Sequence, residues 1–240
     1  MSKKINVLAF AAHPDDVEIS ISGIMLKHKA AGLTTGIIDL TGGELGTRGS
    51  AELRAEESAK AARILNLDIR ENLGFRDGFF ETDERHLLEV VKMIRKYQPD
   101  IMLINAESDR HPDHGRAHEL VKRAAFLAGL VKIKTSVDNT DQSPWRPQTL
   151  YSYIQDYHLE PDIVVDVTAF WERRMESLMA YSSQFYNPAS GEAETPISTT
   201  GFLKHIEGRS HQFGRLINVT HAEGLRKVRP VGVDLLTHLL

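Results

Sequence analysis

Two clusters of histidine and aspartate hold the residue types that are best suited to chemistry in this chain. His13, Asp15 and Asp16 stand together in AHPDD, directly after an apolar run, and residues 109–114 (DRHPDH) follow a second apolar run. Imidazole and carboxylate are ligands for zinc and for similar divalent ions, and a carboxylate off the metal can act as a general base. The pattern predicts a metal-dependent hydrolytic site in which the two adjacent aspartates divide these roles.

A single His-Pro-Asp is a weak signal, because proline fixes φ and aspartate often caps the following helix. The pair Asp15 and Asp16 is more specific, since two adjacent carboxylates repel each other unless a positive group compensates them. The strongest signal is that both clusters follow expected strands, so the fold itself decides whether they meet.

The elements that position these clusters can be read from the hydrophobic pattern. Continuous apolar runs predict strands buried on both faces, and 3.6-residue periodicity predicts the helices between them. The expected strands cover residues 5–11, 34–40, 68–72, 100–105, 149–154 and 163–167. The expected helices cover residues 17–31, 51–65, 84–97, 114–130, 168–184 and 202–216, and the polar, glycine-rich stretches 41–50 and 187–200 are expected loops.

Alternating strands and helices predict right-handed crossovers and a mostly parallel, Rossmann-like sheet with helices on both faces. We expect one α/β domain over residues 1–240, because no linker or repeat divides the chain. Ligands of such sheets lie beyond the carboxyl ends of the strands. The clusters after residues 5–11 and 100–105 should therefore meet at one edge, as neighbouring strands lie about 5 Å apart.

The composition narrows the class of protein. A net charge of -4 over 240 residues gives no footprint for nucleic acid. The absence of cysteine excludes disulfides, thiolate zinc ligands and a cysteine nucleophile. The apolar stretch near the N-terminus is too short for a membrane span or a signal peptide, which predicts a cytoplasmic protein without a membrane partner.

The motifs AHPDD, HPDH and the intervening GTRGSAELRAEE resemble those of the LmbE-like, or PIG-L-type, zinc-dependent N-deacetylases. The resemblance covers most of the chain and implies removal of acetyl groups from N-acetylglucosamine units of small glycoconjugates. The stretches LTGGELGTRGSAELR, ENLGFRDGFF and YSSQFYNP are similar to the bacillithiol-biosynthesis branch. That branch converts N-acetylglucosaminyl malate to glucosaminyl malate and acetate. The resemblance also implies a homo-oligomer, often a hexamer.

Carried over residue by residue, the resemblance implies one Zn²⁺ per subunit with His13, Asp16 and His114 as its ligands. Asp15 would be the general base that takes a proton from the attacking water. His111 would steady the developing oxyanion or protonate the departing amine, and either Asp15 or His111 could supply that proton. The same nitrogen and oxygen ligands also accept iron, cobalt or manganese.

The resemblance and the residue types suggest further roles. Asp113 would orient His111 through a hydrogen bond. Arg54 would bind substrate near the metal, the alternative being a solvated helix charge. Glu44 and Arg48 lie in the glycine-rich loop, where Arg48 is suited to a malate carboxylate and the alternative is a loop without ligand. Arg110 would face the pocket or pair with Asp109 or another acid.

Two further positions bear on the site. Phe202 stands near a position where some members of the family carry a tyrosine, and phenylalanine cannot donate a hydrogen bond. His118 lies one turn after His114, but the glutamate of a His-Glu-x-x-His site is missing, which favours a surface residue or one that supports a ligand.

Other functions remain open at the level of sequence. An amidase acting on thiol conjugates of the same sugars, or a deacetylase of another N-acetylglucosamine conjugate, would use the same metal and base. A non-catalytic Rossmann-like binding module would need a glycine fingerprint after the first strand, where this chain has AAHPDD. A two-metal phosphoesterase would need more carboxylate ligands than the clusters offer.

Overall fold

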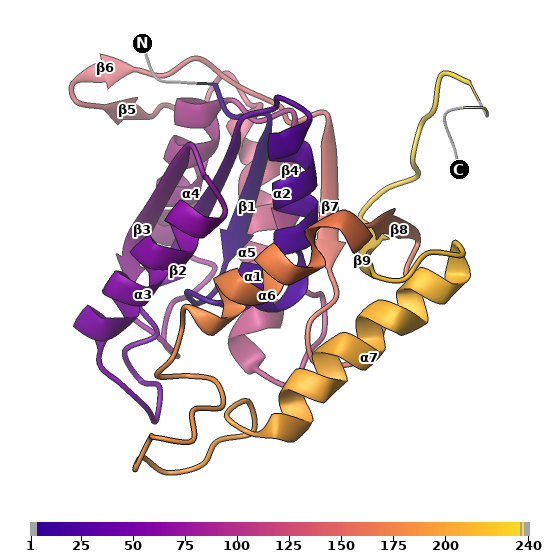
Figure 1. The fold of residues 1–240 in the computed structure, drawn as a ribbon. Helices are drawn as coiled ribbons and strands as arrows, with labels where there is room; N and C mark the ends of the chain where they lie inside the picture. The colour runs from indigo at the N-terminus through magenta and orange to yellow at the C-terminus, as the bar shows by residue number, and fades with distance from the viewer. Residues whose placement is uncertain (1–3, 236, 238–240) are drawn as a thin grey trace.

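The computed structural model describes residues 4–235 and 237. Within these residues, seven strands form one sheet in the order β3-β2-β1-β4-β7-β9-β8, and a two-stranded hairpin lies apart from it (Figure 1). The strands of the sheet are β1 (Val7–Ala11), β2 (Thr35–Thr41), β3 (Ile69–Phe75), β4 (Ile101–Ile104), β7 (Thr149–Tyr153), β8 (Ile163–Asp166) and β9 (Ala222–Lys227). The hairpin consists of β5 (Ser136–Val137) and β6 (Thr140–Asp141).

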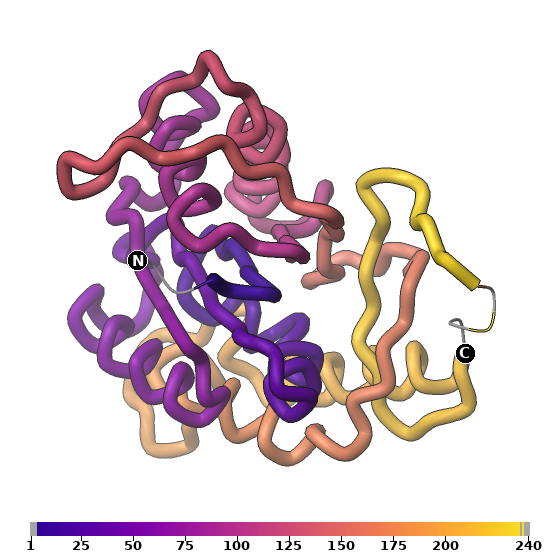
Figure 2. Tube along the Cα trace, turned by 90° about the horizontal axis from the view of Figure 1, so that it is seen from above, coloured from indigo at the N-terminus to yellow at the C-terminus, as the bar shows by residue number. Residues whose placement is uncertain are grey.

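Helices cover both faces of the sheet. They are α1 (Asp16–Ser20), α2 (Ser22–Ala30), α3 (Ala51–Ile64), α4 (Glu84–Tyr97), α5 (Pro112–Ala128), the 3-10 turn η1 (Thr168–Phe170), α6 (Trp171–Met179) and α7 (Thr200–Leu216). Helices α4 and α5 pack on one face, whereas α1, α2, α3 and α6 lie on the other (Figures 1 and 2). The predicted α/β architecture with a mostly parallel sheet is confirmed.

Strand β1 lies in the middle of the parallel part of the sheet and is buried along its whole length. It pairs in parallel with β2 on one side and with β4 on the other, with Val7 opposite Ile101. Alternate β1 side chains enter two apolar layers, with Leu8 and Phe10 facing the α4 and α5 side and Val7 and Ala9 facing the α2 side. This two-sided burial explains the continuous apolar run in the sequence.

Two predicted helices are shorter than expected. The helix over 17–31 is divided at Ile21 (φ -143°, ψ 17°) into α1 and α2, and Glu223 of β9 accepts hydrogen bonds from the freed N–H groups of Gly23 and Ile24 at 3.0 and 2.7 Å. The helix over 168–184 ends at Met179, because Ser183 donates its backbone N–H to Glu57 (2.8 Å) instead of continuing the helix.

The C-terminal third contains an element that the sequence pattern did not predict. Strand β9 runs antiparallel between β7 and β8, and residues 228–235 extend from it beyond this edge of the sheet (Figures 1 and 2). Its sequence, AEGLRK, shows no alternation of apolar and polar residues. Glu223 occupies a buried position of this strand, where it is paired with Arg174. Among the described residues, no helix has the length and apolar character that a membrane crossing requires.

Candidate metal and catalytic site

The carboxyl ends of β1 and β4 bring the two histidine–aspartate clusters together. The ring centroid of His13 lies 4.6 Å from that of His111 and 5.6 Å from that of His114. One ring nitrogen from each of the three residues lies within 4.8 Å of the others. The predicted meeting of the two clusters at one edge of the sheet is therefore found in the structure.

The Asp16 carboxylate lies close to two of these imidazoles. Its Oδ1 lies 3.1 Å from Nε2 of His114, and its Oδ2 lies 3.9 Å from Nδ1 of His13. Two buried amides hold the carboxylate in place: Asn105 Nδ2 donates to Oδ2 (2.9 Å), and Gln155 Nε2 donates to Oδ1 (3.1 Å). Neutral imidazole and carboxylate facing one another in this way form a nitrogen and oxygen donor set that suits zinc.

Both imidazoles that face Asp16 have their second ring nitrogen against another carboxylate. His114 Nδ1 lies 2.5 Å from Asp109, and His13 Nε2 lies 3.0 Å from Asp77. Such a carboxylate fixes the tautomer and orientation of a metal-binding histidine. The geometry leaves Nε2 of His114 and Nδ1 of His13 directed toward Asp16.

The Asp113 carboxylate contacts His13, which differs from the expected contact with His111. Asp113 Oδ2 lies 3.5 Å from His13 Nε2 and accepts a hydrogen bond from Gly78 N (2.9 Å), while Arg116 binds Oδ1 (2.5 Å). The reason is helical geometry, since residues two positions apart at the start of α5 project in different directions. Nδ1 of His111 instead accepts from the backbone N–H of Asp113 at 3.3 Å.

The pKa values of the clustered histidines and of Asp16 depend on their burial and on their pairing with one another. Burial lowers the pKa of His13 and His114, but their carboxylate neighbours outweigh it and raise the two values to about 10 and about 9. Burial alone would raise the pKa of Asp16, yet the two histidines hold it well below its usual range. For His111, burial and then the neighbouring His13 and His114 lower the pKa. Without metal, the positive charges of the cluster therefore sit on His13 and His114.

Asp15 occupies an exceptional backbone position beside this cluster. It precedes α1 with a positive φ of 112° and is 4% exposed. Burial raises the pKa of its carboxyl group to about 7, although Arg54 acts in the opposite direction. A carboxyl group with a pKa near neutrality is suited to accept and return a proton.

Arg54 is a buried part of the pocket wall. Its Nη1 donates to the carbonyl of Pro14 (3.1 Å), its Nη2 donates to Gln184 Oε1 (2.5 Å), and its Nη2 also lies 3.6 Å from Asp15 Oδ2. A Cβ at Gly43, where φ is +67°, would lie 2.4 Å from Arg54 Nη1. The loop therefore needs glycine at this point so that the guanidinium can reach Asp15.

The other proposed substrate groups divide into two sets. Glu44 accepts the backbone N–H of Asp77 (2.7 Å), and Arg48 is bound by Ser190 and Glu192 at 2.5 and 3.5 Å, so both side chains are engaged within the loops. Neither residue lines the pocket. Arg110 does line it and pairs with Asp156 (2.9 Å), while Asp109 pairs with His114 instead.

The cluster opens into a pocket of about 300 Å³. The glycine-rich loop, the start of α5 and the loop before α7 form its walls. The residues that line it include His13, Asp15, Asp16, Arg54, Asp77, Arg110, His111, His114, Gln184, Thr195, Pro196 and Ile197. Phe202 packs near Phe185 in the apolar cluster beneath this region. His118 is buried and its Nδ1 contacts the carbonyl of Asn105 (3.0 Å).

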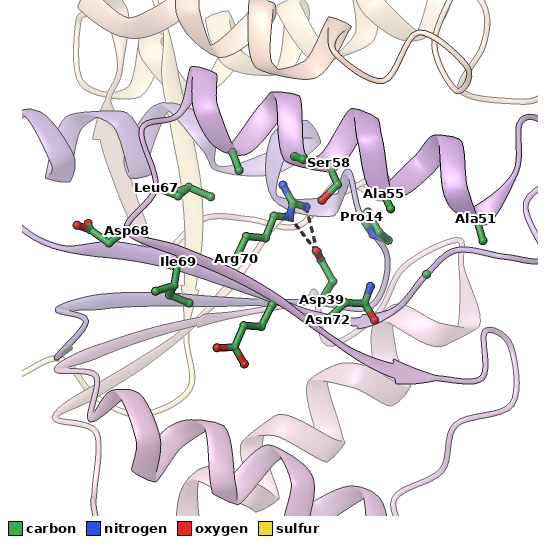
Figure 3. A pocket seen from close by; sticks show the side chains of 14 residues that line it. Pro14, Asp39, Ala51, Ala55, Ser58, Leu67, Asp68, Ile69, Arg70 and Asn72 are labelled. Carbon is green, nitrogen blue, oxygen red and sulfur yellow. Dashed lines mark hydrogen bonds and ion pairs between the residues drawn. The ribbon is translucent and has the colours of Figure 1, made fainter. Parts of the chain in front are cut away.

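A larger pocket of about 440 Å³ lies between α3 and the edge strand β3 (Figure 3). Arg70 projects into it and pairs with both oxygens of Asp39, at 2.8 and 3.0 Å, and with Glu18 at 2.6 Å. Alanines of α3 form much of the opposite wall. The cationic group of this pocket is thus already neutralised by protein carboxylates, whereas the smaller pocket contains the metal-ligating residue types.

Several residues of the site were not predicted in the roles that the structure gives them. Asn105 and Gln155 hold Asp16, Asp109 and Asp77 hold the two histidines, and Gln184 holds Arg54. The sequence did indicate a position at the site for the residues that hold Asp16 and the two histidines, because each of them follows the carboxyl end of a parallel strand. Gln184 carried no such signal, since its position depends on the turn after α6.

The sequence matches the PIG-L family, described as GlcNAc-PI de-N-acetylase, over residues 8–125. It is 28% identical to the diacetylchitobiose deacetylase of Thermococcus kodakarensis over 232 residues, which are 92% of this chain and 82% of that protein. It is also 28% identical to the mycothiol S-conjugate amidase of Streptomyces coelicolor, over 50% of this chain and 51% of that protein.

Solved structures show the same fold. The conserved protein TT1542 from Thermus thermophilus is 33% identical, with a TM-score of 0.85 over 97% of this chain and 98% of that chain. The N,N'-diacetylchitobiose deacetylase of Pyrococcus horikoshii is 24% identical, with a TM-score of 0.79 over 94% of this chain and 83% of that chain.

The sequence match and the fold define the class of protein: an enzyme that hydrolyses amide bonds and whose relatives include deacetylases and an amidase. Residues 8–125 of the chain are similar to the PIG-L family, and the chain shares its fold with solved relatives over nearly its whole length.

Proposed function

We propose that this enzyme removes the N-acetyl group from an N-acetylglucosamine conjugate with one Zn²⁺ held by His13, Asp16 and His114. The observation that carries the proposal is the convergence of these three side chains beside a buried Asp15 in one pocket. The donor set fits zinc, because Asp77 and Asp109 take the outer ring nitrogens of the two histidines. When bound, zinc would polarise the amide carbonyl and lower the pKa of a bound water to roughly 7.

Asp15 is the general base of the proposed reaction. Its carboxylate accepts the proton of the attacking water, and Arg54, 3.6 Å away, stabilises the ionised form. The burial that raises its pKa to about 7 makes the same group able to return the proton to the departing amine. His111 lines the same pocket and stabilises the negative charge that develops on the carbonyl oxygen. His111 is the alternative proton donor.

N-acetylglucosaminyl malate is the substrate that we propose within this class. Arg110 lines the pocket with a half-exposed side chain, and Asp156 engages its Nε; within residues 4–235 and 237 no other partner of the guanidinium is found. A guanidinium in that position suits a carboxylate on the group attached to the sugar. The similarity of the glycine-rich loop to the bacillithiol branch supports the same choice.

The direct test is acetate release by zinc-loaded protein, measured with N-acetylglucosaminyl malate and with N,N'-diacetylchitobiose. We expect hydrolysis of both and a higher kcat/KM for the malate conjugate, and we expect a chelator to abolish both activities until zinc is restored. The matched variant is Arg110→Gln, which should reduce the preference for malate without reducing turnover of chitobiose. Failure of the zinc-loaded protein to release acetate from any N-acetylglucosamine conjugate would refute the proposal.

A second candidate is amide hydrolysis of thiol conjugates of the same sugars, which the similarity to mycothiol S-conjugate amidase favours. In the same assay, an amidase would release a free amine from the thiol conjugate and little acetate from N-acetylglucosaminyl malate. The expected homo-oligomer and the cytoplasmic location stay predictions, which light scattering and cell fractionation address.

A further inference from the structure

Two arginines from different helices are buried beside α1. Arg174 of α6 and Arg209 of α7 are 2% and 9% exposed, and both donate to the carbonyl of Ile19, at 2.5 and 3.2 Å. Arg174 has a carboxylate partner, Glu223, at 3.3 Å. Two positive charges therefore share one backbone acceptor and one directly paired acid.

Arg209 lacks a direct counter-ion. Among residues 4–235 and 237, no carboxylate oxygen lies within 4.0 Å of its guanidinium, and its enclosed Nη1 has no hydrogen-bond partner. Asp156 contributes to its electrostatic surroundings, but that carboxylate is paired with Arg110 at 2.9 Å. A buried charge without a partner is costly, so such a group points to a counter-ion from outside the chain.

Arg209 borders a groove of about 330 Å³ between α7 and the loop after β7. The α7 wall is formed by His205, Gly208, Arg209 and Gln212, which share one side of the helix at i, i+3, i+4 and i+7 spacing. Asp156 and His158 form the opposite wall. A Cβ built on Gly208 meets no described heavy atom within 4 Å, so the groove is open at this point.

We propose that this groove binds a small oxyanion of the carboxylate or phosphate class, with Arg209 as its principal ligand. The polar side chains that line the groove are a guanidinium, two imidazoles, an amide and the Asp156 carboxylate. The first four donate hydrogen bonds to oxyanions, and the carboxylate is paired with Arg110. Since Asp156 is neutralised by Arg110 and Glu223 by Arg174, the anion would supply the missing negative charge. This site differs from the metal pocket, which Arg209 does not line.

The groove adjoins two supports of the proposed metal ligand Asp16. Ile19, whose carbonyl binds Arg209, belongs to the same short helix α1 and lines the metal pocket. Asp156 follows Gln155, whose amide donates to Asp16. An anion at Arg209 would thus be either a free effector or an anionic part of a substrate that extends beyond the pocket.

The test is calorimetric titration of zinc-loaded protein with inorganic phosphate. We expect a site with a dissociation constant on the order of 1 mM. Gly208→Leu places an apolar side chain at the point where the groove is open to a Cβ, and Arg209→Met removes the charge. Each should weaken binding roughly 10-fold or more, the usual effect of losing a charged hydrogen bond. Gly201→Leu, at the exposed start of the same helix, is the matched control and should bind phosphate as the wild type does.

Phosphate held by the metal itself would persist in Gly208→Leu, so equal affinity in this variant and the wild type would overturn the proposal. No binding by the wild type at 50-fold the expected dissociation constant, about 50 mM, would also overturn it. These results do not depend on the proposed substrate, because they measure binding rather than turnover.

Kinetics then separate the two sources of the anion, and this step rests on the proposed function. If the substrate supplies the anion, Gly208→Leu raises KM for N-acetylglucosaminyl malate and leaves KM for N,N'-diacetylchitobiose unchanged. If a free anion binds, phosphate changes the rates with both substrates alike, and Gly208→Leu removes that response. A Gly208→Leu enzyme that matches the wild type in both respects would contradict a role in the reaction.

Discussion

Asp16 and Glu18 both belong to α1, but they are part of two different buried charged clusters, which differ in what their charges face. Glu18 belongs to a cluster with Arg70 and Asp39, in which the guanidinium donates to both carboxylates. Figure 3 shows the Arg70–Asp39 pair of this cluster. Asp16 belongs to the cluster with His13 and His114, in which ligand atoms converge at the wall of a pocket. Burial of charge beside a pocket therefore does not mark a functional site; the distinguishing feature of the cluster around Asp16 is its set of metal-ligating imidazole and carboxylate groups.

The largest expected effect is on catalysis, in the cluster that contains Asp16. Asp15→Asn should reduce kcat by about 10³-fold, since a positioned general base contributes that much, while zinc content stays at one per subunit. Asparagine is the matched substitution because it tolerates the positive φ at this position. Acetate release and metal analysis give the two readouts. Full activity in Asp15→Asn would remove the proposed base from the mechanism.

A change in the cluster of Glu18, Arg70 and Asp39 should alter the stability of the fold instead. Arg70→Met leaves Asp39 and Glu18 buried without their cation, which should lower the free energy of unfolding by roughly 3 kcal/mol. Denaturant unfolding measures this change, with Arg63→Met on the exposed side of α3 as the control. Zinc affinity of the folded variant should be unchanged. A large loss of zinc binding would show that the two clusters are not independent.

A smaller effect is expected from a residue that acts through a ligand. Asp109→Asn keeps an oxygen for the backbone N–H groups of Asp156 and Tyr157 but removes the negative charge beside His114. Zinc affinity should fall by about 10- to 100-fold, as for other carboxylates that support metal-bound histidines. Competition with a chromophoric chelator measures the change, and Asp162→Asn, at an exposed pair with Lys227 away from the pocket, is the control. Unaltered affinity would make Asp109 purely structural.

The smallest effect is the number of protons released when zinc binds to the cluster that contains His13 and His114. Its histidines have pKa values of about 10 and about 9 without metal, so both are protonated at pH 7.5, and zinc requires them neutral. The two histidines should therefore contribute about two released protons at pH 7.5 and progressively fewer as pH rises through 9 and 10, in addition to any proton lost by zinc-bound water. Calorimetry in buffers of different ionisation enthalpy gives this number. Release that is independent of pH over this range would contradict the protonated state.

The parallel part of the fold could be predicted from the sequence because its elements are locally encoded. Strand β1 is apolar at every position since both of its faces are covered, and Ser50 and Asp83 cap α3 and α4 with side-chain hydrogen bonds. The break at Ile21 could not be predicted, because Glu223, about two hundred residues away, caps the second helix. Strand β9 was missed for the same reason: its buried acid is satisfied only by distant residues.

The sequence by itself determined the chemistry of the site: which residues carry imidazole and carboxylate, and that both groups follow strands whose ends must meet in a parallel sheet. Only the tertiary structure decided how those side chains are partnered. Asp113 contacts His13 instead of His111, Arg48 pairs with a distant loop, and Arg209 is buried with no directly paired acid among the described residues. The physical reason is that strands and helix starts are encoded by neighbouring residues, whereas the partner of a buried charge depends on which distant side chains the packing brings within about 4 Å.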